Sequence, residues 1–92
     1  MPTVLIIDDN TSVITALEVL FSLHDIDTLR ATSPPQGVSL LKDNVVDLVL
    51  QDMNFTEDNT SGEEGVALFK QIRESYPDLP VTILSVRSGY AG

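Results

Sequence analysis

Three acidic residues and one serine stand where short apolar runs of this 92-residue sequence end: Asp8, Asp9, Asp52 and Ser85. If the runs at Asp8 and Asp52 form neighbouring strands, these side chains converge on one crevice. Carboxylates that lie close together raise one another's pKa, and a hard divalent cation such as Mg2+ relieves the repulsion. A carboxylate beside such a metal can attack phosphorus and form an aspartyl phosphate. The metal would neutralise charge on the transferred group, and the Ser85 hydroxyl could donate a hydrogen bond to it.

The segments that must position these residues alternate along the chain. Short apolar runs predict strands at Val4–Ile7, Asp27–Thr32, Val45–Leu50 and Pro80–Leu84. The run at Asp27–Thr32 is the more polar one and suits the edge of a sheet. The others are nearly continuously apolar, which is typical of strands that are buried on both faces.

Amphipathic segments lie between these strands and predict three helices. Asn10 or Thr11 could cap the first helix. Ser33 is expected to cap the second, with Gln36 completing a capping box, and Ser61 is expected to cap the third. Strands that alternate with helices indicate right-handed crossovers and a parallel sheet covered on both faces. In such sheets, ligands bind at the carboxyl ends of the strands.

Length and composition restrict the class of protein. The length is enough for one domain. The net charge of −9 argues against sequence-independent binding to nucleic acid or to an anionic membrane. The chain has no cysteine, which excludes disulfides and thiolate metal sites. Its N-terminal apolar run is too short for a signal peptide or a membrane span, so the sequence predicts a cytoplasmic protein.

Three segments resemble the receiver domains of two-component response regulators. They are IIDD at Ile6–Asp9, LVLQDMN at Leu48–Asn54 and PVTILS at Pro80–Ser85. They occur in the order and on the elements of that family, and the resemblance covers nearly the whole chain. It implies an α/β three-layer sandwich, with a parallel sheet in the flavodoxin-like order 2-1-3-4.

The resemblance also implies a role for each site residue. Asp52 would be the phosphoacceptor, and a sensor histidine kinase would supply the phosphoryl group. Mg2+ would be held by Asp9 directly, by Asp8 directly or through water, by Asp52, and by the backbone carbonyl of Asn54. Ser85 would contact the phosphoryl group. The only reaction expected is transfer to the chain's own Asp52, so the chain is not predicted to be an enzyme.

Two departures from the family pattern qualify this assignment. The segment between Asp52 and Gly65 is longer than usual and resembles the receivers of nitrogen-regulation-type, sigma-54-dependent activators, which implies a transcriptional output. Family members also continue through a further helix, strand and helix, and carry a Lys that contacts the phosphoryl group. The lysines here, Lys42 and Lys70, stand on predicted helices instead.

Residues 1–92 are therefore expected to be the N-terminal part of a receiver, without the fifth strand and the last helices. The strand at Pro80–Leu84 would then be an edge, and self-association, such as a dimer, is expected.

Other interpretations of these residues remain. An aspartyl-phosphate phosphatase or phosphotransferase of the haloacid dehalogenase type would need a second Asp where Asn54 stands. A receiver fold could also act as a docking module that is never phosphorylated. Asp8 and Asp9 could merely favour the dipole of the following helix, and Ser85 could merely cap a turn.

Overall fold

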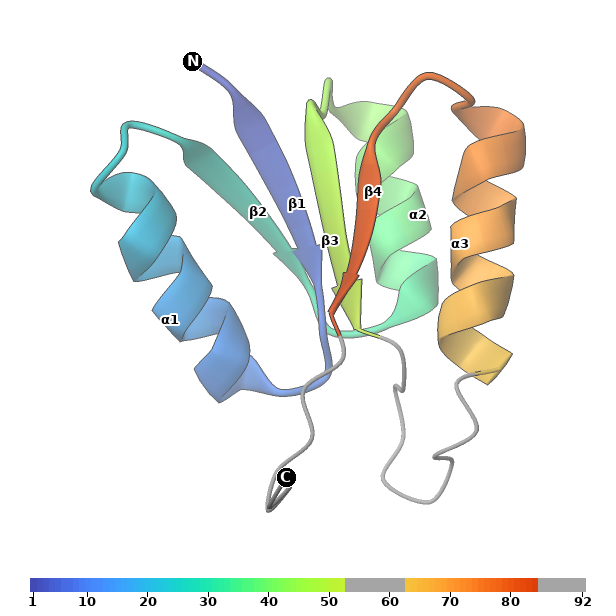
Figure 1. Ribbon diagram of the computed structural model, residues 1–92, viewed down its shortest axis with the longest axis horizontal. Coiled ribbons are helices and arrows are strands. Elements are labelled where there is room, and N and C mark those ends of the chain that lie inside the picture. Colours follow the sequence, from blue (N-terminus) through green and yellow to red (C-terminus); the bar gives the residue numbers. More distant parts are fainter. Residues whose placement is uncertain (53–62, 85–92) are drawn as a thin grey trace.

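The structure, a computed structural model, describes residues 1–52 and 63–84, in which strands and helices alternate (Figure 1). The elements are β1 (Thr3–Ile7), α1 (Thr11–Ser22), β2 (Asp27–Ala31), α2 (Pro34–Asp43), β3 (Leu48–Asp52), α3 (Glu63–Ser75) and β4 (Val81–Leu84). The predicted order of elements is confirmed.

The four strands form one parallel sheet in the order β2-β1-β3-β4. This confirms the predicted flavodoxin-like order and places β2 at an edge, as its polar sequence indicated. β1 and β3 are neighbours, with Ile7 opposite Gln51. The chain positions that follow, Asp8 and Asp52, therefore lie level with each other at the carboxyl edge.

The sheet lies between α1 on one face and α2 with α3 on the other (Figure 1). Alternate residues of β1 face opposite layers: Leu5 and Ile7 belong to the core beneath α2 and α3, and Val4 and Ile6 to the core beneath α1. Because both faces are covered, the strand is apolar throughout. Each fully buried Leu or Ile contributes about 1.5–3 kcal/mol, so β1 is firmly anchored just before the acidic pair.

A glycine allows α2 to approach the end of β1 closely. A Cβ at Gly37 would lie 2.5 Å from Cδ1 and 2.9 Å from Cγ1 of Ile7. Gly37 is buried, and a larger residue there would have to displace Ile7. Since Ile7 directly precedes Asp8, this contact fixes the end of β1 from the α2 side.

The starts of α1 and α2 were predicted closely, with one difference, whereas Ser61, the expected cap of α3, lies outside the described residues. Asn10 caps α1 by accepting hydrogen bonds from the backbone N–H groups of Ser12 and Val13, at 3.0 and 3.4 Å. Ser33 caps α2, as expected, by accepting from the N–H of Gln36 at 3.4 Å. The Gln36 side chain, however, accepts from the N–H of Thr32 at 3.0 Å and not from the cap residue. The reciprocal bond of the predicted capping box is thus shifted by one residue.

The start of β3 was predicted wrongly. The strand begins at Leu48, whereas Val45 precedes it and is 86% exposed. The reason lies at Asp47, whose N–H donates to the Thr3 carbonyl at 2.8 Å while its carboxylate accepts from the Thr3 N–H at 2.8 Å. The Asp47 side chain thereby takes the place of a backbone hydrogen bond between β1 and β3, and regular pairing of the two strands starts one residue later, at Leu48. β3 also extends to Asp52, which pairs with Leu84 of β4.

Candidate functional site

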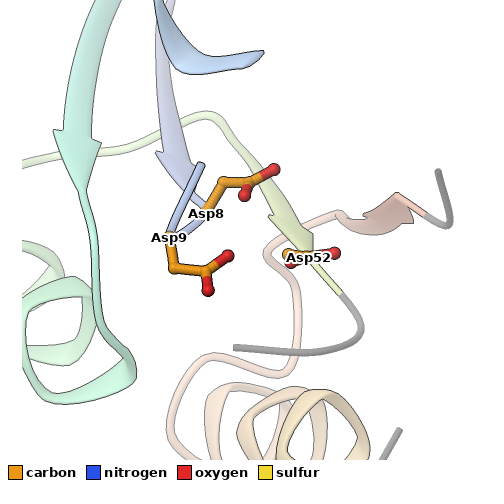
Figure 2. A group of neighbouring side chains, drawn as sticks. All are labelled: Asp8, Asp9 and Asp52. Carbon is orange, nitrogen blue, oxygen red and sulfur yellow. The ribbon is translucent and has the colours of Figure 1, made fainter. Parts of the chain in front are cut away.

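Three carboxylates gather at the carboxyl ends of β1 and β3 (Figure 2). Asp8, Asp9 and Asp52 each offer an oxygen, and these oxygens lie within 4.8 Å of one another. The three residues differ in exposure, since Asp8 is buried, Asp52 is half-buried and Asp9 is exposed. The structure therefore brings together the three acidic residues that the sequence singled out, in an open-sided arrangement.

The turn that follows β1 holds Asp8 in place. Its backbone N–H donates to the Ala31 carbonyl at 3.0 Å, which continues the β1–β2 pairing by one residue. One of its carboxylate oxygens accepts from the N–H of Asn10 at 2.8 Å. Because Asn10 also caps α1, the start of that helix and the direction of the Asp8 carboxylate are fixed by the same residue.

The surroundings of Asp8 raise the pKa of its carboxyl above the ordinary value of 3.8. Burial is the main cause, because desolvation disfavours the charged form. The charges of Asp52 and Asp9 raise the pKa further, whereas the hydrogen bond from the Asn10 N–H lowers it in part. Without a cation, the ionised form of the Asp8 carboxyl is therefore electrostatically unfavourable.

The donor set fits Mg2+. All three ligands are hard carboxylate oxygens, and Mg2+ binds few protein carboxylates at about 2.0–2.1 Å while it keeps several waters. Ligands on opposite sides of such an ion lie about 4 Å apart, so the separation of up to 4.8 Å needs only small side-chain adjustments. Asp9, which is exposed, leaves room for water and for an incoming substrate.

Two predicted site residues, Asn54 and Ser85, lie outside the described residues, so their placement remains a prediction. Sequence patterns did not single out Gln51, which is fully buried beside Asp52. The sequence feature that could have identified Gln51 is a polar residue inside an otherwise apolar strand, at a position that alternation assigns to the core.

Comparison with known proteins decides the family. The sequence matches the response regulator receiver domain over residues 4–91. The chain belongs to this family. Receiver domains typically bind Mg2+ at the acidic pocket and act in signalling rather than as enzymes with turnover. The predicted family membership and fold are thereby confirmed.

Two relatives of the chain have different names and are both much longer than the chain. The chain is 31% identical over 85 residues to the transcriptional regulatory protein ZraR of Escherichia coli, which covers 92% of the chain and 18% of ZraR. It is 31% identical over 88 residues to the autoinducer 1 sensor kinase/phosphatase LuxN of Vibrio harveyi, covering 96% of the chain and 10% of LuxN. The chain thus spans less than a fifth of either relative.

Solved structures agree with the fold. The response regulator TrrA of Thermotoga maritima, in complex with Mg2+ and a beryllium fluoride, superposes with a TM-score of 0.81. The alignment covers 98% of the chain and 74% of TrrA at 20% identity. Among the described helices, none is long and apolar enough to cross a membrane.

Proposed function

We propose that this chain receives a phosphoryl group on Asp52 from a sensor histidine kinase, with Mg2+ bound by Asp8, Asp9, Asp52 and the backbone carbonyl of Asn54. The observation that carries the proposal is the convergence of three carboxylates at the carboxyl ends of β1 and β3. Membership of the receiver family supports the choice of phosphorus chemistry.

In the proposed reaction, a carboxylate oxygen of Asp52 attacks the phosphorus of a phosphohistidine. The new O–P bond forms as the P–N bond breaks, and the electron pair stays on the imidazole nitrogen, which takes up a proton. Asp52 is suited to this role because it ends β3, where paired backbone holds its Cα while its side chain stays partly accessible. Bound Mg2+ would supply charge neutralisation at the transferred group.

The other residues of the site would prepare and read the product. The Asp8 carboxylate is already oriented by the Asn10 N–H, so binding the cation requires little reorganisation. The Ser85 hydroxyl would donate a hydrogen bond to a phosphoryl oxygen. Ordering around that group would shift a two-state equilibrium and pass the signal onward.

Two relatives support a proposal for what the signal controls. ZraR is a transcriptional regulatory protein, and this favours a transcriptional output for the protein that carries this domain. LuxN is a sensor kinase/phosphatase, so a place within a kinase is the second candidate. The kinase that phosphorylates Asp52 would use ATP, which places the proposed reaction in the cytoplasm.

Incubation with a small phosphodonor such as phosphoramidate tests the proposal. With Mg2+, the intact mass of the chain is expected to increase by one phosphoryl group, and hydroxylamine should remove it because acyl phosphates are labile. Addition of EDTA should prevent the modification. Modification is expected to be slow, because the Lys that contacts the phosphoryl group in family members has no counterpart among the two lysines of this chain. Lys42 and Lys70 are exposed residues of α2 and α3 instead. Continued turnover of a phosphate ester would instead favour the phosphatase interpretation, and no modification at all would favour a docking module.

We also propose that the 92-residue chain self-associates through β4. Within residues 1–52 and 63–84, this strand pairs with β3 on one side and with no strand on the other. Exposed edges recruit further strands, and a second copy offers the same edge. Light scattering at rising concentration should show dimers, and Thr82→Lys should reduce them more than Ser39→Lys on α2. A monomer at all concentrations would contradict this proposal.

A further inference from the structure

A buried amide adjoins the proposed phosphoacceptor. Gln51 is 0% exposed, and it lies between Ile7 of β1 and Ile83 of β4 in the sheet. Alternation along β3 puts its side chain on the face of Val49, which belongs to the core beneath α2 and α3. Polar residues are rare at such positions unless hydrogen bonds compensate for their burial.

The amide nitrogen of Gln51 joins two parts of the chain that are far apart in sequence. It donates to the carbonyl of Gly65 at 2.7 Å and to the carbonyl of Asp52 at 3.4 Å. Gly65 is buried in the first turn of α3, and Asp52 is the last residue of β3. One side chain therefore ties together both elements that flank the segment 53–62.

The other end of the same amide argues against a purely stabilising role. In the part of the chain that the structure describes, Oε1 of Gln51 is buried and has no hydrogen-bond partner. An unsatisfied buried carbonyl lowers the stability of the folded chain, whereas an apolar side chain of the same size would avoid that cost. Local violations of this kind are expected at functional sites, where geometry matters more than stability.

We propose that Gln51 is a positioning residue of the phosphorylation site, which ties the backbone of Asp52 to the first turn of α3. The proposal rests on the function proposed above. The bond to the Asp52 carbonyl restricts the orientation of the Asp52 backbone. It thereby also restricts the direction in which the Asp52 carboxylate faces Asp8 and Asp9. The bond to Gly65 sets the distance between the end of β3 and the start of α3.

Gln51→Met separates positioning from stability, because it keeps the length and volume of the side chain and removes its hydrogen bonds. The free energy of unfolding without Mg2+, measured in urea, is expected to be unchanged or higher. The dissociation constant for Mg2+, measured from backbone amide shifts of Asp8, Asp9 and Asp52 by NMR, should increase about tenfold, the scale seen when groups that orient metal ligands are lost. Phosphorylation by phosphoramidate should slow in parallel.

The matched control is Gln71→Met, the same change at an exposed position of α3, which should alter neither quantity. Gln51→Leu provides a second apolar variant if methionine does not pack. An unchanged Mg2+ affinity in a folded Gln51 variant would overturn the inference, and lower stability alone would show a merely structural role. If Mg2+ shifts none of the three amides in the unsubstituted chain, the proposed function itself fails, and this inference fails with it.

Discussion

Asp52→Asn is expected to abolish phosphorylation of this chain. The amide nitrogen and oxygen of asparagine are far weaker nucleophiles than a carboxylate, and the substitution also removes one oxygen ligand of the proposed Mg2+ site. Loss of a nucleophile lowers rates by at least about 1000-fold in well-characterised enzymes, so the remaining modification should be undetectable. The measurement is the intact mass after incubation with phosphoramidate and Mg2+, followed by mapping of the modified peptide.

The matched control is Asp43→Asn, which makes the same change of charge at an exposed residue of α2. Asp43 is the last residue of that helix, whose C-terminal end lies at the end of the sheet away from the acidic site (Figure 1). The Asp43→Asn variant should be phosphorylated as fast as the unsubstituted chain and should take up beryllofluoride with Mg2+ equally well. Modification of Asp52→Asn at an undiminished rate would show that another residue accepts the phosphoryl group, and the assignment of Asp52 would be wrong.

The pocket could be predicted because its position follows from topology. An apolar run ending in Asp8 and Asp9, and another ending in Asp52, place acids at strand ends. Parallel order then brings the ends together wherever two such strands are neighbours. The structure adds what no pattern specifies: the turn that aims Asp8 through the Asn10 N–H, and the close contact of Gly37 with Ile7 that fixes the strand before it.

Long-range side-chain bonds explain what the sequence could not predict. The start of β3 depends on Asp47 bonding to Thr3, which is distant in the chain, so the apolar Val45 was misassigned to the strand. The role of Gln51 depends on Gly65, which only the packing of α3 on the sheet reveals. Such contacts are set by tertiary structure, and local periodicity carries no information about them.

Asp8→Asn is expected to stabilise the metal-free chain at neutral pH. The pKa of the Asp8 carboxyl is raised in the folded state, chiefly by burial and then by Asp52 and Asp9, so the folded chain holds this proton more tightly than the unfolded chain does. Its contribution to stability is complete below the ordinary value of 3.8 and is lost as the pH rises through the folded-state pKa. A neutral amide avoids this loss, with an expected gain of about 1 kcal/mol, as for other substitutions that relieve a functional site.

Urea unfolding with EDTA, at a series of pH values, measures this effect as the difference between Asp8→Asn and the unsubstituted chain. The difference should be small under acidic conditions, grow as the pH passes the raised pKa, and stay constant above it. Mg2+ should reverse the order of stability at neutral pH, because it stabilises only a folded chain that can bind it, and Asp8→Asn should bind it about tenfold or more weakly. If Asp8→Asn were more stable than the unsubstituted chain by the same amount in Mg2+, a metal-binding role for Asp8 would be contradicted. Mg2+ would then not stabilise the ionised Asp8 carboxylate in the folded chain.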